Sequence, residues 1–247
     1  MKRQGLILLL IFSAFQMNVY AQKWLNHSID LKNIQEVVNT YQMFNEEHQK
    51  VGSMIFGFWR EDGKIIARDT SQFDDGSVYE TAEFVYDISG SQLTSDHTSM
   101  KTPNIDVDID LSFNNKLAQG NIEVKRAAGE NSLIPVNEKY DYDVVRGEIY
   151  MLLHGLELPK KYTVSFKALV TTGMVISSAQ IYYEGEESVT TPLGKFQCDV
   201  FWLKADGKMP DNKIWISKAS PRTIVKFSVP SASLTIELVS QRDSAKD

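Results

Sequence analysis

The sequence is poor in cysteine and histidine and has no excess of positive charge. Cys198 is the one cysteine among 247 residues, so an exported form of the chain would hold no internal disulfide. The four histidines lack a second His or Cys at a metal-ligand spacing. Lys and Arg number 26 against 32 Asp and Glu, without a basic cluster. This balance argues against binding to nucleic acid or to an anionic membrane surface.

Motifs that would indicate an enzyme are also missing. There is no Gly-x-Ser-x-Gly elbow, no phosphate-binding glycine loop and no His-Glu-x-x-His pattern. A hydrolase would need a Ser or Asp beside His97 or His154 in a cleft, which is the remaining enzymatic alternative. We therefore expect no enzymatic activity, no cofactor and no metal.

Two groups of acidic residues resemble metal or catalytic sites but have simpler explanations. Asp106, Asp108 and Asp110 alternate along a predicted strand and lie about 7 Å apart by strand rise, too far for one Ca²⁺ without another segment. The acids of 184–187 surround Gly185 in a predicted turn. We expect a solvated strand face for the first group and a solvated loop for the second.

The N-terminus carries the longest apolar run. Lys2 and Arg3 precede this run, and the small residue Ala21 follows it, which is typical of a secretory signal peptide. The run is shorter than the roughly 20 apolar residues that span a bilayer. We predict a signal peptide at 1–21, a buried N-terminal helix being the alternative, and a single β-rich domain at 22–247. Without its leader the chain has 24 cations against 32 acids, a formal charge of −8.

A helix is predicted over 28–48, within a helical N-terminal segment at 22–50. Its apolar residues recur at three- and four-residue steps, as on the buried face of an amphipathic helix. These residues are Leu31, Ile34, Val38 and Tyr41. Because β-branched residues are plentiful here, a strand is the alternative.

Residues 51–240 show the alternation of apolar and polar side chains that antiparallel strands have when one face is buried. Ile105–Phe113 shows it most clearly, with apolar residues at the odd positions and Asp or Ser between them. About ten or eleven strands follow, from Ser53–Arg60 to Leu234–Ser240. The polar tail at 241–247 is predicted to be frayed.

One helix is predicted near 143–156, where apolar residues recur at helical spacing after the candidate N-cap Asp143 and before Pro159. His154 near its end suits the negative pole of the helix dipole. The predicted fold is therefore mainly β, a strongly curved antiparallel sheet or half-open β-barrel with one or two helices.

The strand at 195–204 is predicted to organise this sheet. One face of it is strongly apolar, and the other is mixed, as expected near the wet side of the sheet or the mouth of a pocket. The apolar face contains Phe196, Cys198, Val200 and Trp202, and the mixed face contains Gln197, Asp199, Phe201 and Leu203. We expect Cys198 to be buried and structural.

Several motifs in residues 147–240 together resemble an uncharacterised family of exported bacterial β-proteins, a domain of unknown function. They are Leu153-His154-Gly155-Leu156 with Leu158-Pro159, Thr191-Pro192-x-Gly194-x-Phe196-x-Cys198, Lys213-Ile214-Trp215-Ile216-Ser217, Ser220-Pro221-Arg222 and Glu237-Leu238. That family is similar in outline to periplasmic lipoprotein carriers, which are half-open β-barrels that hold acyl chains against a helix lid. The resemblance implies an apolar cavity but assigns no functional residue.

Aromatic residues are concentrated on the C-terminal strands. Core packing explains them simply, but a groove lined by aromatics would also suit an apolar ligand. The candidate ligand-binding residues are Phe166, Phe196, Trp202, Trp215 and Phe227. Both faces of the strand at Trp215 are apolar, so a helix, a ligand or a partner must cover each of them.

We therefore predict a non-enzymatic protein of a Gram-negative envelope, periplasmic or secreted after cleavage following Ala21. Its expected partner is a lipid or another apolar small molecule. It is not expected to be an integral membrane protein. The alternative is a structural or protein–protein interaction module of the envelope, whose core is filled by its own side chains.

Overall fold

A single 15-stranded sheet dominates the structure. The computed structural model describes residues 31–89, 92–155 and 163–244. The strands follow the order β8-β7-β6-β5-β4-β3-β2-β1-β15-β14-β13-β12-β11-β10-β9, and the sheet does not close into a barrel. The curved, mainly β fold predicted from the sequence is confirmed. The signal peptide predicted at 1–21 lies outside the described residues.

The N-terminal half of the chain forms eight strands after a short 3₁₀ turn. These are η1 (Leu31–Asn33), β1 (Val37–Phe44), β2 (Lys50–Glu61), β3 (Lys64–Phe73), β4 (Tyr79–Asp87), β5 (Gln92–Lys101), β6 (Ile105–Asn114), β7 (Leu117–Arg126) and β8 (Ser132–Lys139). The other half contains β9 (Val144–Val145), α2 (Arg146–His154), β10 (Thr163–Val170), β11 (Val175–Thr191), β12 (Gly194–Ala205), β13 (Asn212–Ser217), β14 (Ile224–Val229), η2 (Pro230–Ala232) and β15 (Leu234–Asp243).

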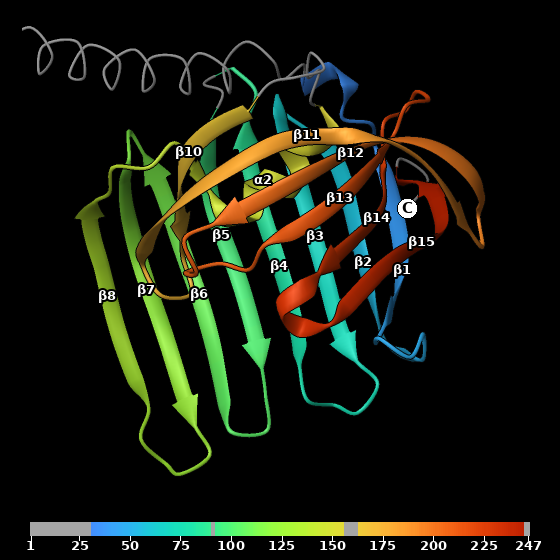
Figure 1. Cartoon of the computed structure of the whole chain (residues 1–247). Helices are drawn as coiled ribbons and strands as arrows, with labels where there is room; N and C mark the ends of the chain where they lie inside the picture. The colour runs from blue at the N-terminus through green and yellow to red at the C-terminus, as the bar shows by residue number, and fades with distance from the viewer. Residues whose placement is uncertain (1–30, 90–91, 156–162, 245–247) are drawn as a thin grey trace, which may run out of the picture.

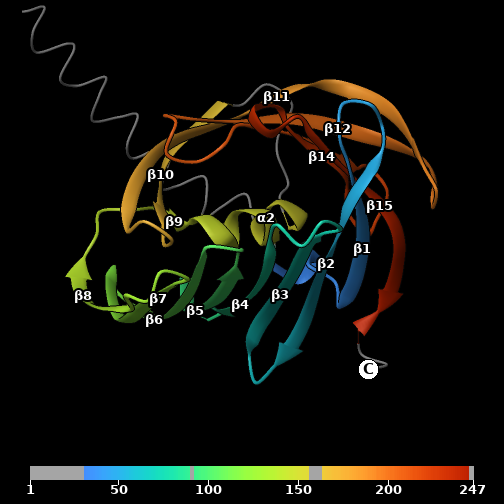
Figure 2. The same cartoon turned by 90° about the horizontal axis from the view of Figure 1, so that it is seen from below.

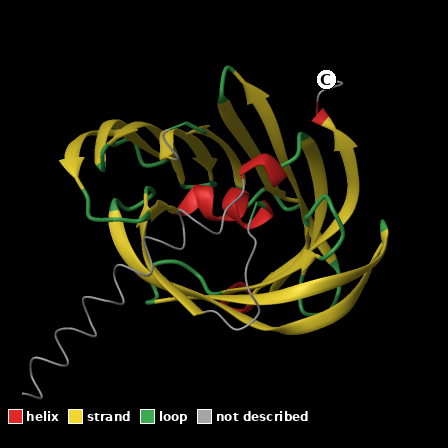
Figure 3. Ribbon diagram, turned by 90° about the horizontal axis from the view of Figure 1, so that it is seen from above, coloured by secondary structure: helices red, strands yellow, loops and turns green. Residues whose placement is uncertain are grey.

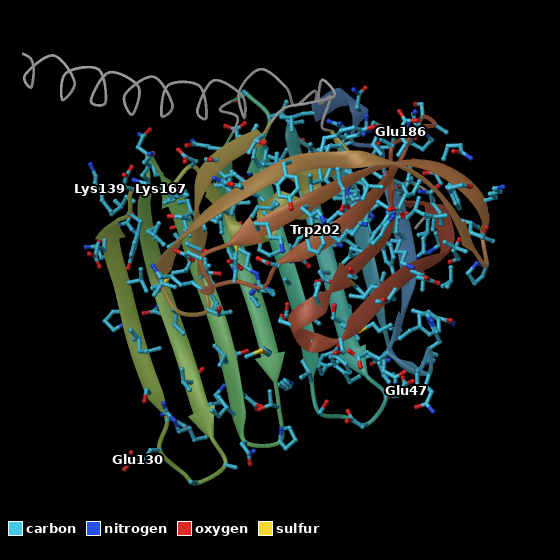
Figure 4. All side chains as sticks on the ribbon, viewed as in Figure 1. Glu47, Glu130, Lys139, Lys167, Glu186 and Trp202 are labelled. Carbon is cyan, nitrogen blue, oxygen red and sulfur yellow. The ribbon has the colours of Figure 1, made fainter. Side chains whose placement is uncertain are left out.

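The sheet bends back on itself into two walls. We call β2–β8 the long wall and β10–β14 the short wall, and strands β1 and β15 lie at the bend between them (Figures 1 and 2). In Figure 1 the lower ends of the long-wall strands extend past the short wall, and the labelled Glu130 in Figure 4 marks the lowest of their turns. One end of the inner face of the long wall is therefore less covered than the other.

The main core lies between the walls, with α2 inside it (Figure 3). Glu148, Ile149 and all of 151–154 are buried, whereas Arg146, Gly147 and Tyr150 keep partial exposure. Gly147 lies so close to the long wall that an added Cβ would be 2.1 Å from the Phe84 ring of β4. A larger residue at this position would separate the helix from the sheet.

The first and last strands pair with each other at the bend. Strand β1 is antiparallel to both β2 and β15. The Tyr41 hydroxyl of β1 donates to the Ile224 carbonyl of β14 at 3.0 Å, and the Ser244 hydroxyl donates to the Phe58 carbonyl at 2.6 Å. Strands far apart in sequence thus connect the two walls.

The helix predicted over 28–48 is wrong. Within the described part of this stretch, the chain forms η1 and strand β1. Tyr41 and Met43 alternate with outward-facing residues, but the next inward position holds the buried Asn39, which hides the strand pattern. The many β-branched residues were therefore the better guide.

The frayed tail predicted at 241–247 is also wrong over its described part. Strand β15 continues to Asp243, and Ser244 is buried. Strand β8 was missed, because Pro135 and the charged end of this edge strand obscure its pattern. The helix near 143–156 is confirmed as α2.

Candidate functional site

The inner face of the long wall consists of rows of residues that lie side by side across the strands. The first of three such rows, which we call the deepest row, contains Phe58, Ala67, Phe84, Asp96, Leu111, Gly120 and Val136. The next contains Phe56, Asp69, Ala82, Thr98, Ile109, Ile122 and Ile134. The third, which we call the rim row, contains Met54, Ser71, Glu80, Met100, Val107, Val124 and Ser132.

Burial decreases across these rows. The side chains of the deepest row are buried, whereas every residue of the rim row is only partly buried. Met54, Val107 and Val124 of the rim row pack against the main core, and Ile134 beside them is 48% exposed. The core therefore continues into an apolar surface that water can reach.

A polar cluster lies between this surface and α2. Asp69 and Glu80 on the long wall are partly buried, as are Arg146 and Tyr150 one turn apart on the helix. Burial, followed by the nearby charge of Glu80, raises the pKa of Asp69 to about 7. Burial also raises the pKa of Glu80, while the Arg146 charge lowers the pKa of both acids. The helix thus presents its partly exposed face to the acids beside the rim row.

Two titratable side chains of α2 are more deeply buried than Arg146 and Tyr150, and burial favours their neutral forms. Burial raises the pKa of Glu148 to about 8, although its Oε1 accepts a hydrogen bond from the Val145 amide at 2.6 Å. Burial lowers the pKa of His154 to about 4. The rings of Phe56 and Phe58 contact His154, so the cationic residue expected at the helix end is instead a neutral core residue. Neither group is placed to act on a ligand at the rim.

The five aromatic residues predicted to line a ligand site do not share one surface. Phe166 and Phe227 are buried in the main core, whereas Trp215 belongs to a small cluster on the outer face of the short wall. Phe196 packs against both clusters. Trp202 is half-buried on β12, in the wall nearest the viewer in Figure 4, with the Lys204 ammonium 4.0 Å from the ring centroid.

The outer cluster explains how both faces of the Trp215 strand are covered. The indole Nε1 donates to Glu187 Oε2 at 2.7 Å, and the ammonium groups of Lys213 and Lys226 lie over the ring. Cys198 is buried in the same cluster, and burial raises the pKa of its thiol to about 11. The chain itself, and not a ligand or partner, covers this outer face.

The predicted assignment of the two faces of β12 is therefore reversed. Cys198 and Val200 belong to the small outer cluster, whereas Phe201 and Leu203 of the supposedly mixed face belong to the main core. Both faces are apolar because the strand separates two cores of unequal size. Alternation identified the faces but not the side on which the larger core lies.

The acidic groups have structural partners. Lys125 pairs with Asp108 at 3.2 Å, and His97 pairs with Asp110 at 2.9 Å on the outer face of the long wall. The acids at 184–187 lie in strand β11 and not in a loop, and Lys213 and Lys218 pair with them. Within 31–89, 92–155 and 163–244, no three His, Cys, Asp or Glu residues are grouped so as to hold a metal ion.

Two surface depressions differ in their lining. One of about 420 Å³ is lined by Phe166, Lys167, Ala179, Lys204 and Ala205, among others. The other, of about 510 Å³, lies near Arg60 and Pro221 at the bend. The first has more apolar than polar lining, and the second is mainly polar.

Sequence reasoning missed Asp69, Glu80 and Asp96, all of which lie on the inner face. Single acids inside alternating strands resemble residues of a wet face, so none of the three was singled out as a candidate. The strand parity does contain a signal. Asp69 shares its face with Ile65 and Ala67, and Glu80 shares its face with Ala82 and Phe84.

Comparison with known proteins identifies the family. Residues 47–239, well over half of the chain, match the model of a family described as a protein of unknown function, DUF3108. The chain belongs to the DUF3108 family. The predicted resemblance to exported bacterial β-proteins of unknown function is thereby confirmed. No curated protein matches the sequence.

Several solved structures are similar to this DUF3108 protein at low sequence identity. A β-barrel-like DUF1849 protein from Brucella abortus has a TM-score of 0.50 at 10% identity, over 84% of this chain and 97% of that chain. The hypothetical lipoprotein YmcC from Escherichia coli (K12) has a TM-score of 0.38 at 10% identity, over 91% and 95%. An exported protein with a YmcC-like fold from Bacteroides fragilis has a TM-score of 0.33 at 8% identity, over 84% and 96%.

The described helices of the DUF3108 chain include none that is long and apolar enough to cross a membrane. Its β-barrel-like relative shows similarity of fold alone, because 10% identity carries no residue roles. The inner face of the long wall, with its rim row and polar cluster, remains the best candidate site.

Proposed function

We propose that this DUF3108 protein is a non-catalytic binding protein of the envelope, which holds a lipid or an acylated molecule against the inner face of the long wall. The observation that carries the proposal is the partial exposure of the apolar rim residues Met54, Met100, Val107 and Val124. All but Met100 of these pack against the main core. A ligand chain covering this surface would be stabilised by roughly 25 cal/mol per Å² of apolar area removed from water.

The proposal moves the binding residues away from most of the aromatic side chains. Phe166 and Phe227 face the same interior and would form its deep end. Trp202 and Trp215 lie on the other face of the short wall and are not part of the proposed site. The rim row and Ile134 take their place.

Strand β8 offers a matched pair of variants. Ile134 shares a row with the buried Ile122, whereas Leu133 lies beside Glu123 on the opposite face. They are 48% and 67% exposed, so neither substitution empties a core position. We expect Ile134→Asp to weaken binding of the apolar dye 1-N-phenylnaphthylamine by about tenfold, because a carboxylate would enter the ligand surface. Fluorescence titration of the full chain measures this affinity.

Leu133→Asp should bind the dye like the unmodified protein, and mass spectrometry of an organic extract should show a stoichiometric lipid. Equal loss in both variants would indicate a general effect on β8. A clean extract from a protein that does not bind the dye would contradict the proposed function.

The second candidate is an envelope interaction module with a self-filled core. The buried α2 and its contact with Phe84 favour it, because the upper part of the interior is filled by the chain itself. A lipid-free extract without dye binding would be its expected signature. Both candidates place the protein in the periplasm or outside the cell after cleavage following Ala21, which N-terminal sequencing of the exported chain tests.

A further inference from the structure

Three carboxylates lie on the inner face of three adjacent strands. Asp69 is on β3, Glu80 on β4 and Asp96 on β5, and the rows that hold them lie next to one another. The charge of Asp96 raises the pKa of Glu80, and the charge of Glu80 raises the pKa of Asp69. The three acids therefore form one electrostatic group beside the apolar rim.

Asp96 is the unusual member of this group. Its exposed fraction is 0%, yet its Oδ2 makes no hydrogen bond with any described residue. Burial raises the pKa of the Asp96 carboxyl, while the Thr98 hydroxyl, which donates to Oδ1 at 2.6 Å, and the Thr171 hydroxyl lower it. A buried carboxylate oxygen without a donor is costly, so its persistence here points to a function.

The charges around the group are unbalanced. The positive charge facing it from α2 is Arg146, which lowers the pKa of Asp69 and Glu80. Burial raises the pKa of all three acids, because their full ionisation beside one guanidinium would leave two negative charges in a partly desolvated place. Such a site favours a cation, because Coulomb interactions strengthen as water is excluded.

We propose that the ligand carries a positively charged amine at the end of its apolar chain, and that the amine lies among Asp69, Glu80 and Asp96. The inference rests on the proposed function, because the same rim row would hold the chain. Asp69 and Glu80 are partly exposed and form the accessible edge of the acid group. Asp96 lies behind them, fully buried, and a bound ammonium group would favour its ionised form.

Ligands with a negatively charged end are disfavoured. A fatty acid or a phosphate ester would bring a further negative charge towards the three acids, and the positive charge of Arg146 is already shared between Asp69 and Glu80. An uncharged alcohol would neither gain nor lose strongly. Ligands with the same chain and different ends therefore separate the contributions of the chain and of its polar group.

The test uses three amphiphiles of equal chain length, dodecylamine, dodecanol and dodecanoate, kept below the concentrations at which they form micelles. Each displaces 1-N-phenylnaphthylamine from the full chain at neutral pH. We expect dodecylamine to compete at about tenfold lower concentration than dodecanoate, with dodecanol between them. Glu80→Gln and Asp96→Asn should each reduce the amine preference, measured as the ratio of dodecylamine to dodecanol affinity in the same variant.

The matched control is Asp106→Asn, which removes a carboxylate from the outer face of β6 and should keep the preference intact. Equal competition by all three amphiphiles would overturn the amine assignment and leave the apolar-ligand proposal standing. A preference that survives in both Glu80→Gln and Asp96→Asn would also overturn it. Failure of all three amphiphiles to bind would instead contradict the proposed function. Retained dodecanol binding shows that a variant is folded.

Discussion

At the scale of single residues, the interior of this protein contains ionisable groups that burial keeps neutral. His154 has its Nδ1 2.8 Å from the Tyr150 carbonyl, and its Nε2 accepts from the Ile224 amide at 3.4 Å. Its position near the end of a predicted helix favoured a cation. The position along a helix does not show, however, whether the side chain is buried by the surrounding structure. The histidine instead connects α2 to the short wall as a neutral hydrogen-bonding group.

Glu148 gives a prediction of pH dependence. Its folded pKa of about 8 lies above the ordinary value of 4.5, so the folded state holds the proton more tightly than the unfolded state does. The associated stability is fully present below pH 4.5 and is lost as the pH rises towards 8. Glu148→Gln keeps an oxygen for the Val145 amide and has no proton to lose. We expect the variant to match the unmodified protein near pH 4.5 and to exceed its stability at pH 8.

Urea unfolding at both pH values measures this difference. Glu138→Gln, which changes an exposed glutamate of β8, is a control that should alter neither midpoint. A Glu148→Gln protein that is less stable at pH 8 would show that the ionised carboxylate is stabilised in the fold.

At the scale of elements, alternation predicted most strands of the long wall, because each has one buried face. It failed where the buried position is polar, as at Asn39, and where an edge strand contains Pro135. The five predicted ligand-binding aromatics are divided between two faces for a related reason. Alternation correctly places Phe196 and Trp202 on the same face of β12. Only the curvature of the sheet decides which face of the strand is inside.

Helix α2 depends on its close approach to β4. Gly147→Ala would place Cβ 2.1 Å from Phe84, so the ring or the helix must shift. We expect a loss of about 1–3 kcal/mol in the free energy of unfolding, as in overpacked cores. Gly173→Ala is the matched control, because its Cβ would meet Val175 at 3.7 Å, an ordinary contact. Comparable urea midpoints for the two variants would contradict this packing.

At the scale of the whole molecule, one sheet carries both walls. Strands β1 and β15 stand in the middle of the strand order, although they come from opposite ends of the chain. Sequence patterns predicted one curved sheet, but this pairing has no local signal because it joins segments about 200 residues apart. The continuity of the hydrogen-bonded ladder argues for a single cooperative unit.

Tryptophan fluorescence tests this cooperativity. Trp59 lies on β2 in the long wall and Trp215 on β13 in the short wall. We expect variants that retain one of these two reporters to unfold at the same urea concentration, once corrected for the stability change caused by the substitutions. Separate midpoints for the two walls would show that each wall is an independent unit.

The sheet ends at β8 on one side and β9 on the other, without pairing these edges. A closed barrel has a radius set by its strand number and stagger, so widening it requires breaking backbone hydrogen bonds. A sheet with free edges has no such condition. The distance between the walls can change by bending of the sheet alone, with every interstrand hydrogen-bond ladder intact. The same fold could therefore accept ligands of different widths.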